Sequence, residues 1–339
     1  MKLKPVVIAA SIALATAASA QGTGPVKIGF ITDMSSLYAD IDGPAGAEMV
    51  KWAAEDFGGK VLGRPIEVLS ADHQNKADVA SSKAREWIDK DGLSMLVGGT
   101  NSGTSLAMAT VAQEKKLPFI SIGAGSARLT NEACTPYTVH YAYDTVALAK
   151  VAGNALVKGG AKNWFFLTAD YAFGHSLEAD ATSVVKANGG AVAGAVRHPL
   201  NASDFSSFLL QAQTSKAQVL ALANAGGDFT NAMKAAREFG INKSMKIAGL
   251  LVFLTDIHSL GLKNTEGLLL TTSWDWNLDD KTRDFGRKFF AKTIVAMRDI
   301  CIARYEAFGT AGNASKIKPI SLEAMYQRYL KGELNAKVN

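Results

Sequence analysis

The sequence has few of the residues that build covalent or metal-based scaffolds. Its 339 residues include two cysteines and five histidines, which excludes a disulfide-dense scaffold and a four-thiolate metal site. The histidines are scattered without metal-ligand spacing, so we expect no metal. The formal net charge of +5 is diluted over the whole length, and it does not by itself indicate a nucleic-acid binder.

Motifs for nucleotide and hydrolytic chemistry are absent. No G-x-x-x-x-G-K-[ST] loop occurs, and no G-x-G-x-x-G follows the first predicted strand, so nucleotide hydrolysis and nicotinamide chemistry lack support. The sequence contains neither G-x-S-x-G nor H-E-x-x-H. Two pairs, Asp170 with His175 and Asp275 with Asp279, have only the spacing of ordinary loop residues. We therefore expect no enzyme activity and no cofactor.

The first twenty residues have the three-part pattern of a secretory signal peptide. Lys2 and Lys4 precede an apolar run over 6–18, and Ala18-Ser19-Ala20 forms a small-x-small cleavage site. The run is shorter than the roughly 20 residues of a membrane span, and no later stretch is long and apolar enough to be one. We expect an exported, periplasmic protein. Cys134 and Cys301 could pair there, but the sequence does not show their distance.

Strand and helix patterns alternate along the rest of the chain, in two blocks. This alternation predicts an α/β fold with parallel sheets and helices on both faces. The segment Leu129–Asp144 is neither a clean strand nor a clean helix, and we interpret it as the crossing between two lobes. The predicted strands are Val26–Thr32, Ile66–Ala71, Leu93–Val97, Pro118–Ile122, Trp164–Thr168, Ala191–Arg197, Val219–Ala223 and Ile247–Gly249. The predicted helices include Pro44–Phe57, Lys76–Asp89, 102–115, Gly174–Ala187, Phe205–Thr214 and Phe229–Phe239.

Glycine-hydroxyl turns follow two consecutive strands of the first block. Gly98–Ser105 opens a helix, and Ser121–Ser126 follows the next strand. Free backbone N–H groups at a helix start are a good seat for a carboxylate, although for the first turn taken alone a plain N-cap at Asn101 or Ser102 is the more common explanation. Ligands of parallel sheets bind beyond the carboxyl ends of the strands. Together the turns predict a site for a small polar head group.

These motifs, taken in order, resemble the type I periplasmic solute-binding proteins of branched-chain amino-acid (Leu/Ile/Val-type) ABC transporters. The resemblance covers about residues 25–292. It rests on VKIGFITDMS, GPAGAEMVKWAAEDFGG, GRPIEVLSADHQNKADVA, LVGGTNSGTSLA, KLPFISIGAGSARLT, FLTADYAFGHS and AMKAAREFGI. It implies two Rossmann-like lobes that close on a ligand by a hinge movement. Lobe 1 would hold 25–141 plus about 273–320, and lobe 2 would hold 142–272, with the C-terminal residues possibly added.

The resemblance also implies which residues bind the ligand. Ser102, with Ala124 and Ser126, matches the turns that grip a carboxylate, and Phe173 beside Tyr171 matches the aromatic cover. The remaining expected contacts are Tyr38, Gly226, Asp228 and Leu251. Amino-acid binders of this class place a glutamate where this chain has Leu250 and Leu251. Because an unpaired ammonium is costly in a closed cleft, we expect a carboxylate with an apolar or aromatic body, unless Asp228 replaces the missing acid.

The resemblance implies an ABC permease with its ATPase as partner, and a monomer. It fades from Ile294 onward, where Met297–Phe308 and Ser321–Leu330 still have helical patterns. An altered reading frame is one explanation for this change. The sequence therefore does not define the last crossing between the lobes.

A ligand-sensing domain of a receptor has the same expected fold and cleft. An exported α/β enzyme is the other alternative, but we find no nucleophile–base pair for it.

Overall fold

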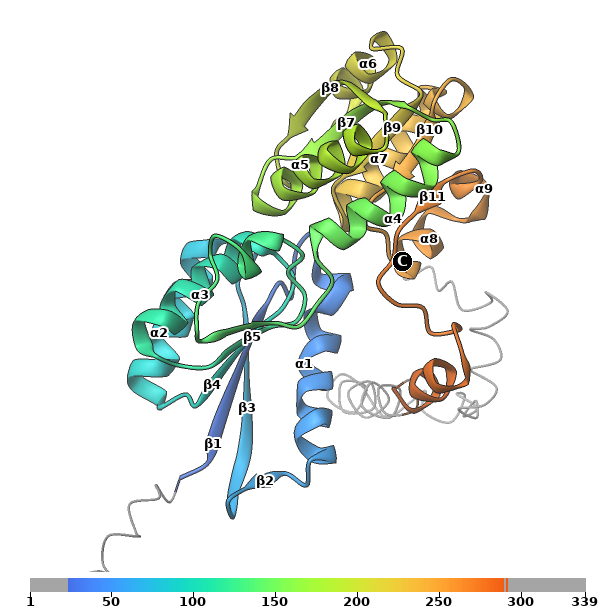
Figure 1. Cartoon of the computed structure of the whole chain (residues 1–339). Coiled ribbons are helices and arrows are strands. Elements are labelled where there is room, and N and C mark those ends of the chain that lie inside the picture. Colours follow the sequence, from blue (N-terminus) through green and yellow to red (C-terminus); the bar gives the residue numbers. More distant parts are fainter. Residues whose placement is uncertain (1–23, 290, 292–339) are drawn as a thin grey trace, which may run out of the picture. The chain divides into compact units, whose positions relative to one another are not determined.

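The computed structural model describes residues 24–289 and 291, and Figure 1 shows its elements coloured along the chain. The chain divides into two compact units, one ending at Thr271 and the other beginning at Thr272. No helix in these described ranges is long and apolar enough to cross a membrane. The predicted signal peptide and the predicted helices 297–308 and 321–330 lie outside the described residues.

The first part of unit 1, called lobe 1 here, is built on a six-stranded sheet of order β2-β3-β1-β4-β5-β6. β2 pairs antiparallel with β3, and the other neighbours are parallel. The strands are β1 (Val26–Thr32), β2 (Lys60–Val61), β3 (Arg64–Asp72), β4 (Met95–Gly98), β5 (Phe119–Ser121) and β6 (Thr138–His140). The helices are α1 (Ala39–Asp56), α2 (Ala77–Asp91) and α3 (Ser102–Lys115), with a 3₁₀ turn η1 (Ala127–Thr130).

Both faces of the lobe 1 sheet are covered by helices. Phe30 of β1 packs with Ala47 of α1 on one face. Its neighbour Ile31 joins the opposite cluster, which contains Trp87 of α2 and Met108 of α3. Successive strand residues point to opposite faces, so the continuous apolar run of β1 is what a sheet buried on both sides requires.

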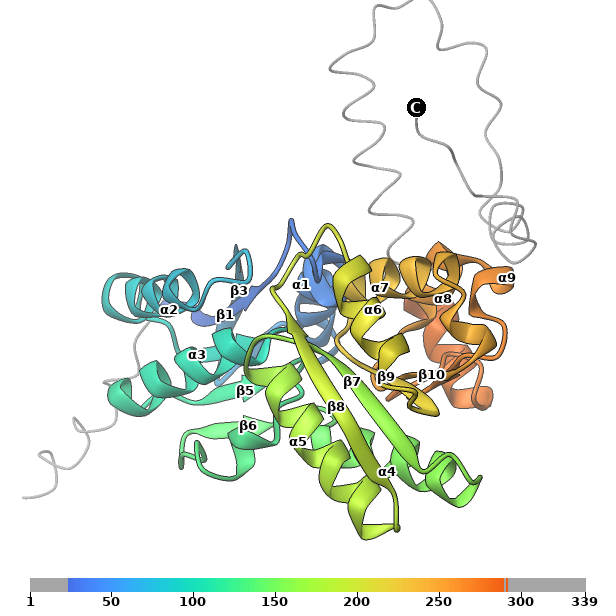
Figure 2. The same cartoon turned by 90° about the horizontal axis from the view of Figure 1, so that it is seen from above.

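The second part of unit 1, called lobe 2, has a five-stranded sheet of order β11-β10-β9-β7-β8, in which every pairing is parallel. Figure 2 views both sheets from above. The strands are β7 (Asn163–Ala169), β8 (Ala191–His198), β9 (Val219–Ala223), β10 (Lys246–Gly249) and β11 (Leu269–Leu270). The helices are α4 (Thr145–Lys158), α5 (Ala172–Ala187), α6 (Ser206–Thr214), α7 (Gly226–Glu238), α8 (Leu254–Leu260) and α9 (Leu262–Thr265), with a 3₁₀ turn η2 (Ile241–Lys243).

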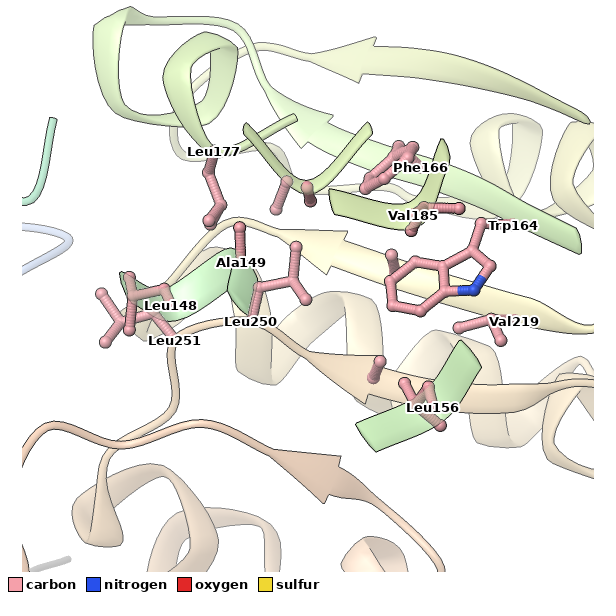
Figure 3. Close-up of a cluster of buried hydrophobic side chains, with 14 of the residues drawn as sticks. Leu148, Ala149, Leu156, Trp164, Phe166, Leu177, Val185, Val219, Leu250 and Leu251 are labelled. Atoms are coloured by element: carbon pink, nitrogen blue, oxygen red, sulfur yellow. The ribbon is translucent and has the colours of Figure 1, made fainter. Parts of the chain in front are cut away.

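The core of lobe 2 consists of two large clusters of buried apolar side chains. Trp164 and Phe166 of β7 point to the face covered by α4 and α5, where they meet Leu156 and Val185 (Figure 3). The alternate residues of β7 point to the other cluster, which includes side chains of α6 and α7. The indole N–H of Trp164 donates to the carbonyl of Ala161 at 2.8 Å, so this fully buried ring leaves no polar atom unpaired.

The predicted α/β class with parallel sheets and two lobes is confirmed, with three local corrections. The segment Leu129–Asp144 is not only a crossing, because β6 lies within it and pairs with β5; the crossing from one sheet to the helices of the other is shorter. Helix α4 was not predicted. Helix α7 begins at Gly226 rather than Phe229, so the predicted glycine loop is the first turn of a helix. The predicted assignment of 273–320 to lobe 1 remains a prediction.

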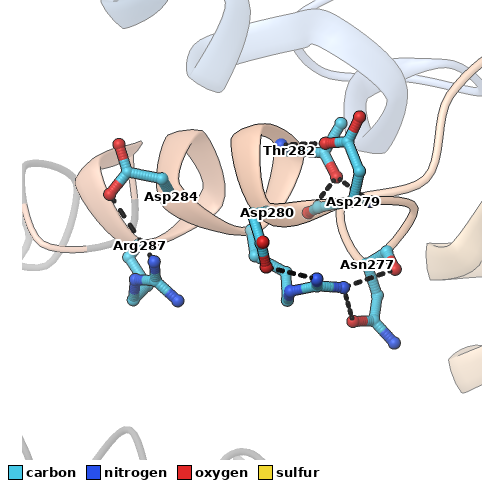
Figure 4. A network of polar contacts seen from close by, with 7 residues as sticks. Asn277, Asp279, Asp280, Thr282, Asp284 and Arg287 are labelled. Atoms are coloured by element: carbon cyan, nitrogen blue, oxygen red, sulfur yellow. Dashed lines mark hydrogen bonds and ion pairs between the residues drawn. The ribbon is translucent and has the colours of Figure 1, made fainter.

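Unit 2 contains a described helix over 280–289. Its start is capped by Asp279, whose carboxylate accepts the N–H of Thr282 at 2.8 Å (Figure 4). Asp280 forms a first-turn ion pair with Arg283 at 2.6 Å. The sequence-based interpretation of Asp279 and Asp280 as cap and first-turn charges is therefore correct, and neither residue is part of an acid–base pair.

Candidate ligand-binding cleft

The candidate site lies where the strand order reverses in each sheet. In lobe 1, β1 lies between β3 and β4, and in lobe 2, β7 lies between β8 and β9. The loops after such neighbouring strands diverge and leave a crevice beyond the strands' carboxyl ends. Residues that follow β1, β4, β7 and β9 all contribute to one cavity.

The cavity is almost closed. Its volume is about 10 Å³, roughly the space of a single water molecule. Five predicted site residues line it, namely Tyr38, Ser102, Tyr171, Phe173 and Leu251. The other lining residues are Ile41, Thr100, Asn101, Gly123, Gly125, Tyr143 and Ala225.

The polar end of the cleft is the start of helix α3. Asn101 is its N-cap, and the Asn101 side chain accepts the N–H of Thr104 at 3.1 Å. The Asn101 carbonyl accepts the N–H of Ser105. In the described part of the chain nothing accepts the N–H of Ser102. This N–H therefore remains available, at the positive end of the helix dipole.

Four aromatic rings line the same cleft. They come from both lobes: Tyr38 and Tyr143 lie beside Tyr171 and Phe173. The hydroxyl of Tyr38 donates to that of Tyr171 at 2.9 Å. Burial raises the pKa of Tyr38, Tyr143 and Tyr171, so all three phenols are neutral hydrogen-bonding groups at physiological pH.

Further contacts join the two lobes around the cleft. The hydroxyls of Ser126 and Ser176 lie 2.7 Å apart, and the N–H of Gly227 approaches the carbonyl of Leu37 at 3.5 Å. Gly226 has φ +58°, and a Cβ there would lie 3.0 Å from the Leu37 oxygen. Only glycine suits that combination of backbone angle and close approach. The structure therefore has its lobes in contact.

Four predicted contacts lie outside the cavity lining. Ala124 and Ser126 are buried in the turn behind it, and the N–H of Ser126 donates to the hydroxyl of Ser102 at 3.0 Å. Gly226 packs against Leu37 and Tyr38 rather than opening onto the cavity.

The expectation that Asp228 could pair with a ligand ammonium is wrong for this structure. The side chain of Asp228 is fully buried and does not line the cleft. Its carboxylate accepts the N–H groups of Asn201 and Ala202, each at 3.1 Å. Burial raises the pKa of Asp228 to about 6 despite these hydrogen bonds. Asp228 thus anchors the turn after β8 to helix α7.

The sequence reasoning did not select Tyr143, Asn101, Gly123 or Gly125 as site residues. Tyr143 lies in the crossing. No regular strand or helix spacing there indicates which way its side chain points. The two glycines were visible as parts of a turn, but the backbone positions themselves, not the neighbouring Ala124 and Ser126, reach the cavity.

None of the twelve lining residues is charged. The partly buried carboxylate of Asp42 lies beside the lining residues, where it accepts the N–H of Thr100 and the hydroxyl of Thr32, both at 2.6 Å. Burial raises the pKa of Asp42. Among the described residues no cluster of His, Cys, Asp and Glu could hold a metal ion. Cys134 is exposed and unpaired there, and Cys301 lies outside the described residues.

Residues 25–311 match the model of a family described as periplasmic binding protein. The chain belongs to the periplasmic binding protein family. This assignment agrees with the two parallel-sheet lobes and with a cleft at their switch points. It also confirms the resemblance drawn from the sequence motifs.

Solved structures show the same fold. A periplasmic binding protein from Burkholderia mallei is 67% identical, with a TM-score of 0.79 over 80% of this chain and 72% of that chain. A branched chain amino acid ABC transporter periplasmic ligand-binding protein from Burkholderia xenovorans LB400 is 40% identical, with a TM-score of 0.68 over 79% and 72%. An ABC transporter solute binding protein from Rhodopseudomonas palustris BisB5, in complex with 3,4-dihydroxybenzoic acid, is 25% identical, with a TM-score of 0.70 over 79% and 74%.

One similarity is to a protein of another kind. A stretch of 53 residues, 16% of this periplasmic binding protein, is 81% identical to a fructose-bisphosphate aldolase of Stutzerimonas stutzeri. The chain spans only 15% of the length of that enzyme, so most of the aldolase has no counterpart here.

Proposed function

We propose that this protein is the extracytoplasmic substrate-binding subunit of an ABC importer, which holds a small organic carboxylate between its lobes by hinge closure. The observation that carries the proposal is the composition of the cleft. The cleft offers the N-terminus of α3 with Ser102 and four aromatic rings, and none of its lining side chains is charged. Such a site fits a ligand with an anionic head and an apolar or aromatic body.

The head of the ligand is assigned to the Ser102 end. A helix N-terminus of fourteen residues carries a partial positive charge and attracts anions. The N–H of Ser102 would donate to the carboxylate. The phenol groups of Tyr38 and Tyr171 would bind polar substituents at the far end of the ligand, since their hydroxyls already bond to each other there.

The absence of an acidic side chain among the lining residues indicates which ligands fit. An α-ammonium needs an acceptor of negative charge when it is buried, because an unpaired buried charge is costly. With Asp228 and Asp42 both bonded to backbone N–H groups, we favour aryl or aliphatic carboxylates without an α-amino group. The complex of the Rhodopseudomonas relative with a dihydroxybenzoic acid supports this class.

Two alternatives differ from this proposal in the ligand or in the system. The name of the Burkholderia xenovorans relative supports a branched-chain amino acid, which would require a backbone acceptor for the ammonium. A ligand-sensing domain of a receptor would use the same cleft. The genes beside this one distinguish these systems, because an importer requires a permease and an ATPase.

Location and partners follow from the proposed role. The signal-peptide pattern over residues 1–20 supports export to the periplasm, with the ABC permease as partner and a monomer as the working form. We infer that the aldolase-like stretch falls in the C-terminal segment, beyond the motifs that carry the family resemblance, while the family model matches as far as residue 311. A stretch covering 15% of an enzyme gives no aldolase activity in this account.

A thermal-shift series with matched ligands tests the proposal. Benzoate, 4-hydroxybenzoate and 4-methylpentanoate should each raise the melting temperature, because a ligand that binds only the folded state stabilises it. Leucine differs from 4-methylpentanoate by its α-ammonium and should have little effect, and benzyl alcohol controls for the carboxylate. Stabilisation by leucine but not by 4-methylpentanoate would contradict the proposed ligand class.

A further inference from the structure

A chain of polar side chains runs behind the cleft wall of lobe 1. The side-chain amide of Asn75 donates to the carboxylate of Asp33 at 2.6 Å and accepts from the side chain of Asn101 at 3.0 Å. Asp33 in turn accepts the N–H of Tyr38 at 2.7 Å, and Asn101 caps α3. Asn75 does not line the cavity, yet it bridges the two segments that place Tyr38 and Ser102 there.

Backbone angles show that this network holds an unfavourable conformation. Asn75 has φ +57° and Asn101 has φ +104°. The first value is tolerated by asparagine, whereas the second lies outside the usual left-handed region. Residues with such backbone angles persist only where their surroundings determine them. The Asn101 side chain donates to Asn75 and accepts the N–H of Thr104, and these two bonds fix the direction of the turn before Ser102.

A buried histidine supports the same turn. The N–H of Asn75 donates to Nδ1 of His73 at 3.1 Å, which requires Nδ1 to be unprotonated. Nε2 of His73 lies 3.1 Å from the carbonyl of Thr100, so we assign the ring proton to Nε2 as donor. Burial lowers the pKa of His73, which keeps the ring in this neutral form.

We propose that Asn75 is a positioning residue for the ligand: it sets the spacing between the aromatic end of the cleft at Tyr38 and the carboxylate seat at Ser102. This inference rests on the proposed function for its ligand, but the coupling it describes is a property of the ligand-free chain. Asn75 is suited to the role because an amide supplies a donor and an acceptor at once. Asp33 can only accept, and the Asn101 amide nitrogen can only donate.

The variant Asn75→Asp makes the coupling conditional on pH. Aspartate tolerates the positive φ, and its carboxylate still accepts from Asn101, but when ionised it cannot donate to Asp33 and repels it. At lower pH, one proton shared between the carboxyl groups at positions 75 and 33 restores the hydrogen bond between them. The other titratable groups nearby are His73, which accepts the N–H of Asn75, Asp72 and Lys76, which both bond to Gln74 of the same loop, and Asp42, which interacts with Asp33. The wild type measured at each pH accounts for their titration.

The experiment measures amide hydrogen-exchange protection and ligand affinity for the full chain at pH 7.5 and pH 5.0. At pH 7.5, Asn75→Asp should lower the protection of the Tyr38 and Thr104 amides together, and should weaken 4-hydroxybenzoate binding at least tenfold. At pH 5.0 both effects should shrink relative to the wild type. Asn75→Ala removes these two bonds and the one that the Asn75 amide donates to the Ser36 hydroxyl at 3.0 Å, so its losses should persist at both pH values.

A matched control separates this role from general stability. Asn188 also bonds through its side-chain amide, to Asn154 at 2.9 Å in lobe 2, and Asn188→Asp should leave the Tyr38 and Thr104 protection and the affinity unchanged. The proposal is overturned if the two amides respond independently, if the Asn75→Asp losses do not recover at pH 5.0, or if Asn188→Asp has the same effect. Exchange needs no ligand, so a wild type that binds nothing refutes the proposed function alone.

Discussion

At the scale of single residues, the side chain of Ser102 and its N–H decide what the polar end of the cleft can hold. The sequence identified Ser102 through a resemblance and through its place in a glycine-hydroxyl turn. It could not decide between an N-cap and a ligand contact. The structure resolves these roles: Asn101 is the cap, and Ser102 is the first helical residue and faces the cavity.

Changing Ser102 to aspartate should preserve the fold and abolish binding of carboxylates. An acidic residue in the first turn favours the helix dipole, but Ser102 is buried and a buried carboxylate is costly, so the melting temperature should fall somewhat. Two like charges about 4 Å apart repel by roughly 4 kcal/mol at an effective dielectric constant of 20, which predicts an affinity loss of more than a hundredfold. Calorimetric titration with benzoate measures this.

The control is Ser102→Asn, which has nearly the same size as the aspartate variant and no charge. It should retain most of the affinity that Ser102→Asp loses. Equal losses in the two variants would mean that size, not charge, governs this position, and the assignment of the carboxylate to the α3 end would be wrong.

At the scale of elements, sequence patterns predicted most strands and helices of unit 1. Their buried residues recur at helical spacing or form short apolar runs, and both patterns can be recognised in the sequence. The apolar runs of β1 and β7 are buried on both faces, and α3 was predicted with the bounds that the structure has. Helix α7 begins earlier than expected because Gly226 and Gly227 favour a loop by propensity. Packing against Leu37 of lobe 1 overrides that preference, and such long-range contacts leave no local signal.

Asp228 ties α7 to the turn after β8, and its burial has a consequence for stability. The pKa of Asp228 is raised to about 6 in the folded state, above its ordinary value of about 3.9. The folded state therefore binds the proton more tightly between these values, so this group's contribution to stability falls as pH rises from about 4 to 6. The loss is at most about 3 kcal/mol at 1.36 kcal/mol per pKa unit.

Asp228→Asn removes this titration while keeping one acceptor for Asn201 or Ala202. Urea unfolding at pH 4 and at pH 6.5 should show the variant becoming more stable relative to the wild type as the pH rises. The exposed Asp204 serves as the control position, since Asp204→Asn should lack that trend. A stability difference that is constant across the range would contradict a raised pKa at Asp228.

At the scale of the whole molecule, the sequence predicted an exported two-lobed binding protein, and the fold and family are confirmed. What it could not predict was which residues of each turn meet across the cleft. Gly125 shows why: its neighbours Ala124 and Ser126 fit the resemblance equally well, yet the Gly125 backbone faces Phe173 of lobe 2. Contacts between the lobes depend on how the chain runs through both of them, so the sequence of one segment does not show which of its residues make those contacts.

Gly125→Ala should weaken binding by hindering closure. A Cβ at Gly125 would lie 2.9 Å from a ring carbon of Phe173 and 3.0 Å from one of Tyr143, and overpacking of this kind costs about 1–3 kcal/mol. Because the lobes of this structure are already in contact and Tyr143 packs locally against the Gly123–Gly125 turn, affinity should fall about tenfold or more and the melting temperature without ligand should fall as well. Gly24→Ala, where nothing lies within 4 Å, should change neither. Unaltered affinity in Gly125→Ala would contradict closure in this geometry.

The claim that the cleft accepts carboxylates without an α-amino group is tested most directly by calorimetric titration. The protein is unfolded, dialysed and refolded to remove any carried ligand, and is then titrated separately with 4-hydroxybenzoate and with leucine. The account predicts saturable 1:1 binding of the aryl carboxylate and weak or no binding of leucine. Tight leucine binding with no affinity for aryl carboxylates would contradict it.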